Sequence, residues 1–490
     1  MVGTKRNPGI VLDLPTGMFI GGQYVEATGG QRIETVDPGT GQVFADVPAA
    51  QPDDVDRAVT NSREAFSGKW RQTTPVQRAR ILMRAAALIR HNADRLATIE
   101  TLDSGKPIAE SRGDVETAAA YFEYFGGIAD KLQGNTIPLG PDYISMTLHE
   151  PVGVTVHIIP WNFPLVTTAR GVAPALAAGN TAVVKPATQT PLSALALGAL
   201  LQEAGLPDGA YNVVTGYGSD IGHALTGHPG IDHVTFTGSV PTGIGVMKAA
   251  AQSVTSVNLE LGGKSPVVVL ADADLDAAVE GTLKAIFLNA GQVCSAGSRL
   301  VVERAVHSAM MEKLVARAEA LTIGHGLDDP KLGPLISGGH RELVARYVDG
   351  ARARGVSIAT GGHIVSVEGC DGGYFYAPTI LDSVPSDDIV VQEEIFGPVL
   401  CVQLVDSPEE AISVANGTPF GLCAGIYTKD ITRALRFARD VEAGQVFINQ
   451  YFAGGVATPF GGTKLSGFGR DKGLAALASY YQVKCVTARI

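Results

Sequence analysis

The chain carries the β-branched runs VTVHII (154–159), TAVVK (181–185), YNVV (211–214), HVTFT (233–237) and SVNLEL (256–261). They recur every ~20–30 residues and are separated by Ala- and Leu-rich stretches with the composition of helices. Strands and helices that alternate at this spacing are typical of a parallel, doubly wound sheet. We therefore predict an α/β domain over this region.

The sequence on either side extends the pattern. Upstream, a short β-rich lead precedes Asp53-Asp54, a pair that can cap a helix. Further amphipathic stretches near 75–90, 92–103 and 114–132 predict more helices. Downstream, a second strand–helix series is predicted, and its segments are SPVVVL (265–270), helices near 274–287, 306–320 and 338–354, and FIN (447–449). The two series change over near Gly262-Gly263.

These patterns predict two doubly wound, Rossmann-like α/β domains and a small additional β element. We place the first domain at 1–131 and 152–262 and the second at 263–462. YISMTLHE (143–150) and YYQVKCVTA (480–488) fit neither domain. Both are predicted strands that pair at a subunit interface, within an oligomerisation element at 132–151 and 475–490.

Composition narrows the class of function. The 490 residues include 38 Lys+Arg and 49 Asp+Glu, for a formal charge of −11 without a dense basic run, which argues against a nucleic-acid or anionic-membrane partner. No stretch approaches the ~18 apolar residues of a membrane span, and the N-terminus lacks the apolar core of a signal peptide. Five scattered cysteines without a CxxC indicate a reducing compartment. We expect a soluble cytoplasmic protein.

Two glycine-rich segments resemble known ligand-binding motifs but do not match them, and no metal-binding motif is present. GGKS (262–265) resembles the end of a phosphate-binding loop, but position 258 is Asn where that loop needs Gly. Gly216-Tyr217-Gly218 opens a dinucleotide-type glycine motif whose sixth position is Ile221. The ten histidines include no HExxH, and the Cys and His spacing offers no metal site, so no metal is expected.

Four segments place polar residues among apolar and glycine neighbours at strand ends, where open α/β sheets bind ligands. Asn162 is either a helix N-cap or an amide that stabilises an oxyanion. Glu260 is either a salt-bridged turn residue or a general base whose pKa burial raises. Cys294 is either a small buried hydrophobe or an exposed nucleophile on a glycine-flanked bend. The segments are IPWNFP (159–164), LELGG (259–263), GQVCSAG (291–297) and EEIFGP (393–398).

In this order, the segments resemble the aldehyde dehydrogenase superfamily over nearly the whole chain. The matching motifs are DPGTG (37–41), PWNFP (160–164), LELGGK (259–264), GQVC (291–294), EEIFGP (393–398) and PFGG (459–462). The resemblance implies that Cys294 is the nucleophile, Glu260 the general base and Asn162 the oxyanion donor with the Cys294 backbone N–H. It also implies oxidation of a small-molecule aldehyde to a carboxylic acid through a cysteine thiohemiacetal and a thioester.

The resemblance further implies a nicotinamide cofactor, NAD or NADP. The first domain becomes the cofactor-binding domain and the second the catalytic domain, in a homodimer or homotetramer. The residues matching cofactor contacts are Ile158, Ile159, Pro160, Trp161, Lys185, Thr188, Gly218, Gly222, Gly238, Ser239, Leu261, Gly262, Glu394 and Phe396. Those proposed near the substrate are Phe163, Arg170, Tyr451 and Phe452.

Three positions depart from the family pattern. Thr188 stands where many NAD-using relatives have Glu, which leaves NADP use open. Asp471 replaces a Glu after the SGFGR segment, which puts any proton-relay role there in doubt. Arg170 stands where many relatives have an aromatic residue, and it either binds a distal carboxylate of a semialdehyde or forms a salt bridge at the tunnel mouth. A second arginine used by semialdehyde-oxidising relatives is absent, because position 288 is Leu.

Two alternatives to hydrolytic aldehyde oxidation follow from the same resemblance. In a CoA-acylating dehydrogenase, CoA resolves the thioester in place of water, but such relatives usually lack the base that Glu260 supplies here. A non-catalytic structural protein of this fold would have lost the cysteine or the base. Both are present.

Overall fold

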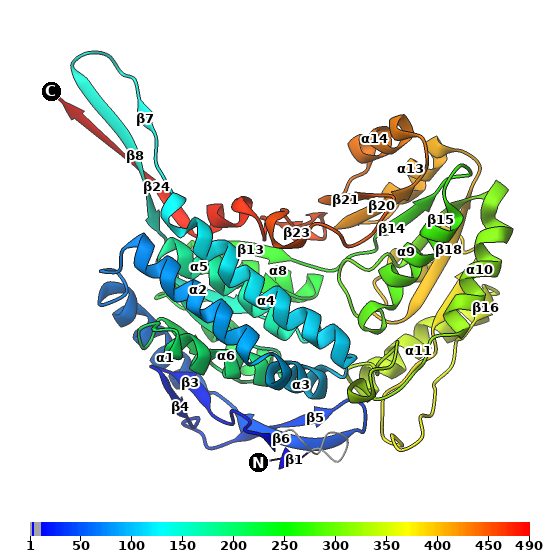
Figure 1. The fold of residues 1–490 in the computed structure, drawn as a ribbon, viewed down its shortest axis with the longest axis horizontal. Coiled ribbons are helices and arrows are strands. Elements are labelled where there is room, and N and C mark those ends of the chain that lie inside the picture. The colour runs from blue at the N-terminus through cyan, green and yellow to red at the C-terminus, as the bar shows by residue number, and fades with distance from the viewer. Residues whose placement is uncertain (1, 4–10) are drawn as a thin grey trace.

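The computed structural model describes residues 2–3 and 11–490, which form two α/β units and a three-stranded sheet that projects from them (Figure 1). The first unit is built on an eight-stranded sheet in the order β23–β13–β12–β9–β10–β11–β3–β4. Its strands are Gly467–Phe468 (β23), Ser256–Glu260 (β13), His233–Thr237 (β12), Val154–Ile158 (β9), Thr181–Lys185 (β10), Tyr211–Val213 (β11), Met18–Ile20 (β3) and Gln23–Val25 (β4).

The five central strands are parallel, as predicted. From β9 the chain adds β10 and β11 on one side and then returns to add β12 and β13 on the other. The order therefore reverses between β9 and β12, and the carboxyl ends of these two strands form the crevice in which doubly wound folds bind ligands.

Helices cover both faces of this sheet, which explains why its strands read as apolar runs. On one face, Val154, Val156 and Val183 pack with apolar side chains of α1, α7 and α8. On the other, Val184 and Tyr211 pack with α2 to α6. The helices are Pro52–Ser67 (α1), Pro75–His91 (α2), Ala93–Ser104 (α3), Ile108–Ile128 (α4), Pro164–Ala178 (α5), Leu192–Glu203 (α6), Gly218–Thr226 (α7) and Val240–Ala250 (α8).

The predicted start of α1 differs in detail. Gln51 occupies the N-cap, Pro52 the first helical position, and Asp54 accepts the backbone N–H of Gln51 at 3.0 Å. Asp54 therefore caps the helix from inside its first turn, where the negative carboxylate interacts favourably with the positive end of the helix dipole.

The second unit holds a seven-stranded sheet in the order β16–β17–β18–β15–β14–β20–β21, parallel except for β16 with β17. Its strands are Ser357–Thr360 (β16), Thr379–Asp382 (β17), Val399–Val405 (β18), Arg299–Glu303 (β15), Pro266–Val269 (β14), Cys423–Tyr427 (β20) and Gln445–Ile448 (β21). Its helices are Leu275–Phe287 (α9), His307–Glu319 (α10), Gly338–Ala353 (α11), Ile389–Gln392 (α12), Pro408–Asn416 (α13) and Ile431–Asp440 (α14). The predicted fold of two doubly wound α/β units is confirmed.

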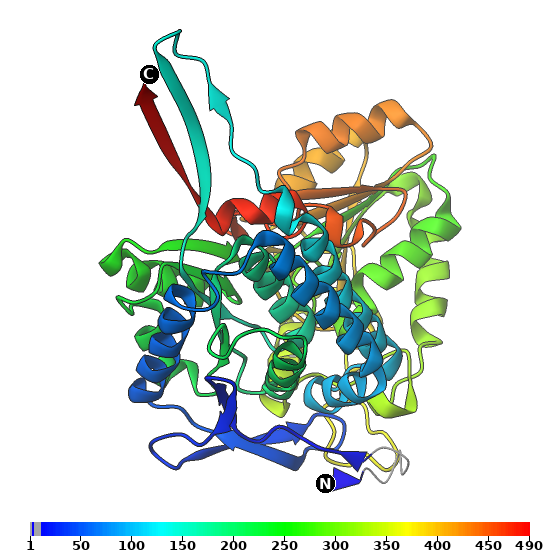
Figure 2. The same cartoon turned by 60° about the vertical axis from the view of Figure 1, so that its left-hand side comes forward.

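The projecting sheet is antiparallel, in the order β24–β8–β7, and it extends away from both units in Figures 1 and 2. Its strands are Tyr481–Arg489 (β24), Tyr143–Pro151 (β8) and Thr136–Ile137 (β7). The two segments predicted to be interface strands thus pair with each other within one chain. Residues 474–479 form a short 3-10 helix, so the last strand begins at Tyr481.

Three short β pairs complete the structure: Arg32–Asp37 with Gln42–Pro48 (β5, β6), Phe420–Gly421 with Thr463–Lys464 (β19, β22), and Val2–Gly3 with Val11–Leu12 (β1, β2). Within the part of the chain that the structure describes, no helix combines the length and the apolar character needed to cross a membrane.

Candidate active site

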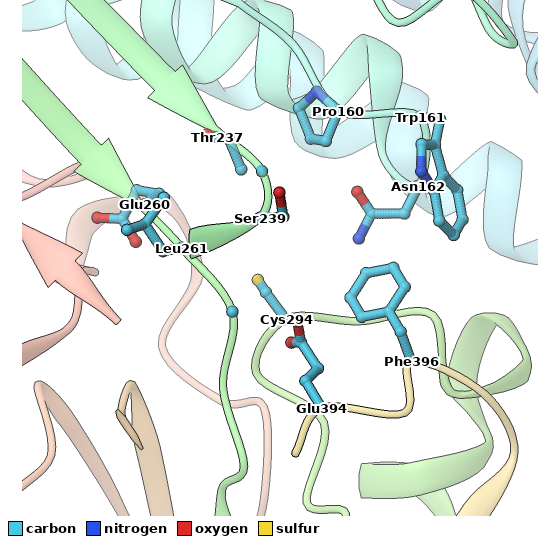
Figure 3. Close-up of a pocket in the computed structure, with 12 residues that line it drawn as sticks. Pro160, Trp161, Asn162, Thr237, Ser239, Glu260, Leu261, Cys294, Glu394 and Phe396 are labelled. Carbon is cyan, nitrogen blue, oxygen red and sulfur yellow. The ribbon is translucent and has the colours of Figure 1, made fainter. Parts of the chain in front are cut away.

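A cavity of about 210 Å³ opens at the carboxyl ends of β9, β12 and β13, where the first unit faces the second (Figure 3). It lies at the strand-order reversal, as the fold predicts for a ligand site. The first unit contributes Pro160, Trp161, Asn162, Thr237, Gly238, Ser239, Glu260, Leu261 and Gly262, and the second contributes Cys294, Glu394 and Phe396. Five segments of the chain thus meet around one space.

Glycines allow these segments to approach one another. A Cβ on Gly262 would lie 2.3 Å from the Glu394 carboxylate, and one on Gly263 would lie 2.4 Å from the carbonyl oxygen of Cys294. Gly291 has a φ of +74°, and a Cβ there would lie 2.1 Å from a backbone oxygen of the EEIFGP segment. At Gly263 and Gly291 the obstructing atoms belong to the backbone, so contact between loops requires glycine at these two positions, whereas at Gly262 the Glu394 side chain could shift.

Asn162 is not a helix N-cap. Helix α5 begins at Pro164, and Phe163 occupies the N-cap position. The Asn162 amide instead donates to the carbonyl oxygen of Gln292 at 2.9 Å, and Asn289 donates to the backbone carbonyl of Asn162 at 3.0 Å. These two bonds tie Asn162 to the loop that carries Cys294. The second amide N–H remains available to a ligand oxygen beside the thiol, as an oxyanion donor requires.

Cys294 projects into the cavity, with its Sγ directed toward the side on which Ser239 lies (Figure 3). The thiol is free and partly exposed. Burial raises its pKa to about 11, while the guanidinium of Arg170 acts in the opposite direction. The thiol form therefore predominates at neutral pH in the protein alone.

This pKa predicts how Cys294 reacts. Because only the thiolate is alkylated, we expect the rate of iodoacetamide labelling at Cys294 to rise about tenfold per pH unit from pH ~7 to ~9 without a plateau. Mass spectrometry of the Cys294 peptide separates this signal from labelling of the exposed Cys485. A plateau near neutral pH would show that the thiolate is already stable in the resting protein.

Glu260 is buried at the end of β13, with 2% of its surface exposed. Neither carboxylate oxygen has a hydrogen-bond partner within the described residues, and in Figure 3 both point away from Cys294. Burial, reinforced by the charge of Asp471, raises the pKa of Glu260 well above its usual range. A carboxylate of raised pKa is a stronger base than an exposed one.

Glu394 and Phe396 form the wall opposite β13. Glu394 accepts the backbone N–H of Gly263 at 2.8 Å, and burial raises its pKa to about 7. The Phe396 ring meets Trp161 edge to face at 5.2 Å. Its backbone has a φ of +59°, and its carbonyl oxygen lies 2.7 Å from Nε2 of His340. This bond holds Phe396 in a conformation that L residues rarely adopt.

The remaining predicted cofactor residues lie along the same edge of the sheet but outside the cavity lining. Lys185 ends β10 with 5% of its surface exposed, and its ammonium donates to the carbonyl of Pro186 at 3.1 Å. Burial lowers the Lys185 pKa to about 8. Thr188 donates to the carbonyl of Gly216 at 3.3 Å. The others are Ile158 and Ile159 at the end of β9, and Gly218 and Gly222 in α7.

None of the four predicted substrate residues lines the cavity. Phe163 packs under the ammonium of Lys106, 4.1 Å from its ring centroid. Tyr451 donates to the carbonyl of Ser295 at 3.0 Å and contacts the ring of Phe452.

Arg170 is buried and forms an ion pair with Asp471, with Nε 2.9 Å from Oδ2. The geometry therefore favours the salt-bridge interpretation over a substrate carboxylate, although the pair is internal and not at a tunnel mouth. Sequence reasoning missed Thr237, which lines the cavity. Its position as the last residue of the run HVTFT was the available signal.

Within residues 2–3 and 11–490, no three or more His, Cys, Asp and Glu side chains gather as a metal site would require. A thiol, an amide and a buried carboxylate thus lie together at the strand-order reversal of a dinucleotide-binding type of fold, and these are side-chain types that covalent thiol catalysis uses.

Comparison with known proteins agrees with this interpretation of the fold and the site. A family model described as "Aldehyde dehydrogenase family" matches residues 24–486. The chain is 45% identical to a betaine aldehyde dehydrogenase of Sinorhizobium fredii, over 96% of each chain. It is 43% identical to a hydroxyisobutyraldehyde dehydrogenase of Mycolicibacterium austroafricanum, over 96% of this chain and 93% of that one. It superposes on the NAD+ complex of a Bacillus cereus aldehyde dehydrogenase with a TM-score of 0.95 and 43% identity, covering 97% and 96% of the two chains. The chain therefore belongs to the aldehyde dehydrogenase family, whose members are oxidoreductases.

Proposed function

We propose that this protein oxidises an aldehyde to a carboxylic acid, with Cys294 as nucleophile, Asn162 as oxyanion donor and Glu260 as general base. The observation that carries the proposal is the meeting of these three side chains around one cavity (Figure 3). The test is formation of reduced nicotinamide and of the acid from a panel of aldehydes, with NAD and NADP side by side.

Each step of the proposed reaction has a residue that can perform it. The Cys294 thiolate adds to the aldehyde carbon, and the oxygen of the adduct accepts the Asn162 amide and the Cys294 backbone N–H. Loss of hydride from that adduct leaves a thioester on Cys294. Glu260 then takes a proton from the water that hydrolyses the thioester, which requires its carboxylate to move from the position turned away from Sγ.

The residues in the cavity and along the adjoining sheet edge suit a dinucleotide. Ser239 is the N-cap of α8, so free backbone N–H groups at the start of that helix can donate to a phosphate, whereas the Gly238 N–H already donates to the carbonyl of Glu260 at 3.0 Å. Lys185 uses one donor within the chain and has others available to a ribose. Glu394 and Phe396 would hold the nicotinamide end. When bound, the nicotinamide accepts a hydride.

A CoA-acylating reaction is the alternative outcome of the same test. Glu260 argues against it, because a base beside the thioester serves water. Acid formation that is independent of added CoA supports hydrolysis, whereas acyl-CoA as the sole product would replace it.

Cofactor preference rests on Thr188. We expect Thr188→Glu to shift preference toward NAD, because a carboxylate there would accept the ribose 2′-hydroxyl and repel a 2′-phosphate. The measurement is the NAD/NADP ratio of kcat/KM. A change below about threefold, ~0.7 kcal/mol, would remove Thr188 from the cofactor site. Thr190→Ser, a buried change nearby, is the control.

The substrate is a small aldehyde, and similarity to the relatives does not identify which one. Two of the relatives above have different substrate names at nearly equal identity, one betaine aldehyde and the other hydroxyisobutyraldehyde. Because Arg170 already has a carboxylate partner, we favour a neutral aliphatic or aromatic aldehyde over a semialdehyde acid.

We further propose a homodimer or homotetramer assembled through the projecting sheet. Side chains of Ile144, Met146, Leu148 and Val486 are exposed. They share one face, because strand side chains alternate and Met146 lies opposite Val486. Such an apolar stripe is typical of a covered surface. Met146→Lys should lower the mass measured by light scattering, whereas Thr487→Lys on the other face should not.

A cytoplasmic location completes the proposal. It is supported by the free thiols of Cys294, Cys401, Cys423 and Cys485, which fit a reducing compartment.

A further inference from the structure

Arg170 and Asp471 form an ion pair that is almost entirely removed from water, with side-chain exposures of 9% and 4%. Arg170 projects from α5 and also donates to the Thr237 hydroxyl at 3.2 Å. Its guanidinium lies over the Phe460 ring, 5.5 Å from the centroid. A buried charge keeps its ionised form only when a partner compensates it, so each member depends on the other.

Hydrogen bonds connect the ion pair to the strands β12 and β13, and Glu260 lies on β13. Thr237 lies opposite Glu260 in the β12–β13 register. Asn258, two residues before Glu260 on β13, donates to Asp471 at 2.8 Å. Asp471 also exchanges two backbone hydrogen bonds of 2.7 Å with Phe460. The next residue, Gly461, is so close that a Cβ there would lie 2.7 Å from the Glu260 carboxylate.

Several charged or titratable groups surround Glu260. Asp471 raises its pKa beyond the effect of burial, and Arg170 lowers it. These groups include Arg170 from α5, Asp471, Arg470 and Lys472 from the segment after β23, Cys294 from the loop after α9, and Cys423 from β20. Arg170 is also the cation that lowers the pKa of Cys294.

We propose that Arg170 and Asp471 act as a positioning pair that lets Glu260 ionise in its buried site, and that Arg170 does not recognise substrate. Asp471 by itself would place a second negative charge beside the base, and Arg170 neutralises that charge. Neither residue lines the cavity, so the pair acts on the reaction through Glu260 and, for Arg170, also through Cys294. The proposal rests on the proposed role of Glu260 as general base.

The test compares the pH dependence of thioester hydrolysis in four proteins: wild type, Arg170→Met, Asp471→Asn and the double variant. Arg170→Met leaves only Lys472 to offset the charge of Asp471, so the acid limb of the pH–rate profile should move to higher pH by about one unit or more. Asp471→Asn leaves Arg170 unopposed, so the limb should move to lower pH. The double variant removes both charges and should lie within about half a unit of wild type.

The double variant also avoids an unpaired buried carboxylate, so it remains informative if Arg170→Met folds poorly. Arg170→Lys keeps the charge and should keep the limb near its wild-type position. In the protein without ligands, Arg170→Met should raise the pH at which iodoacetamide labels Cys294, and Arg170→Lys should not. Arg354→Met, which breaks the ion pair with Asp388 in the second unit, is the matched control and should change neither profile.

Other roles predict different results. A merely structural pair would lower Tm without moving the acid limb, and a substrate-binding Arg170 would raise KM only for aldehydes that carry a carboxylate. Either result overturns the proposal, as does a double variant whose limb matches Arg170→Met. If the limb persists in Glu260→Gln, the general-base assignment itself is wrong, and the proposal falls with it. A limb that vanishes in Glu260→Gln but stays in place in Arg170→Met contradicts only the ion-pair proposal.

Discussion

Cys294→Ala is expected to reduce kcat/KM for aldehyde oxidation at least about a thousandfold, ~4 kcal/mol of transition-state stabilisation. The reason is that a covalent step is lost, and no other thiol lines the cavity in the part of the chain that the structure describes. Steady-state formation of reduced nicotinamide measures the loss. Cofactor binding should persist, because other segments supply the proposed contacts. Quenching of Trp161, which lines the cavity, is a direct reporter of it.

Cys423→Ala is the matched control for this variant. Cys423 is buried on β20 and does not line the cavity, so its removal should leave the chemistry in place. Residual turnover of Cys294→Ala above about 1% of wild type would mean that the nucleophile lies elsewhere.

Glu260→Gln should separate the two halves of the reaction. We expect a stoichiometric burst of reduced nicotinamide in the first turnover, followed by a steady state lower by about 10²–10⁴-fold. Hydride leaves the Cys294 adduct before water is needed, whereas hydrolysis of the thioester requires a base. Rapid mixing followed by absorbance of the reduced cofactor resolves the two phases.

Glu393→Gln is the control, because Glu393 is exposed, accepts from Tyr347 at 2.6 Å and does not line the cavity. It should preserve both phases. Equal loss of burst and steady state in Glu260→Gln would place the carboxylate before thioester formation and remove it from the hydrolytic step.

Sequence patterns predicted most of the fold because each depends on local regularity. The run TAVVK became β10 at Thr181–Lys185, and the stretch near 75–90 became α2 at Pro75–His91. Strand periodicity, helix periodicity and turn residues act over a few positions. Boundaries shifted where a cap decided them, as at Gln51.

The candidate site was predicted less completely. Motifs identified Asn162, Glu260 and Cys294, and the structure brings them to one cavity. Sequence alone left Asn162 between an N-cap and an oxyanion donor, because both roles use the same side chain before a helix. The bond to Gln292 favours the second role, and no local pattern could have shown that contact.

By itself, the sequence determined two α/β units, the family and the identity of the reactive side chains, since these follow from periodicity and from residue types at fixed spacings. Only the tertiary structure decided the partner of Arg170. That partner, Asp471, lies far along the chain and reaches α5 through the segment that returns to β13 as β23. The role of a buried charged side chain depends on the opposite charge that lies beside it, and only the three-dimensional structure shows which residue supplies that charge.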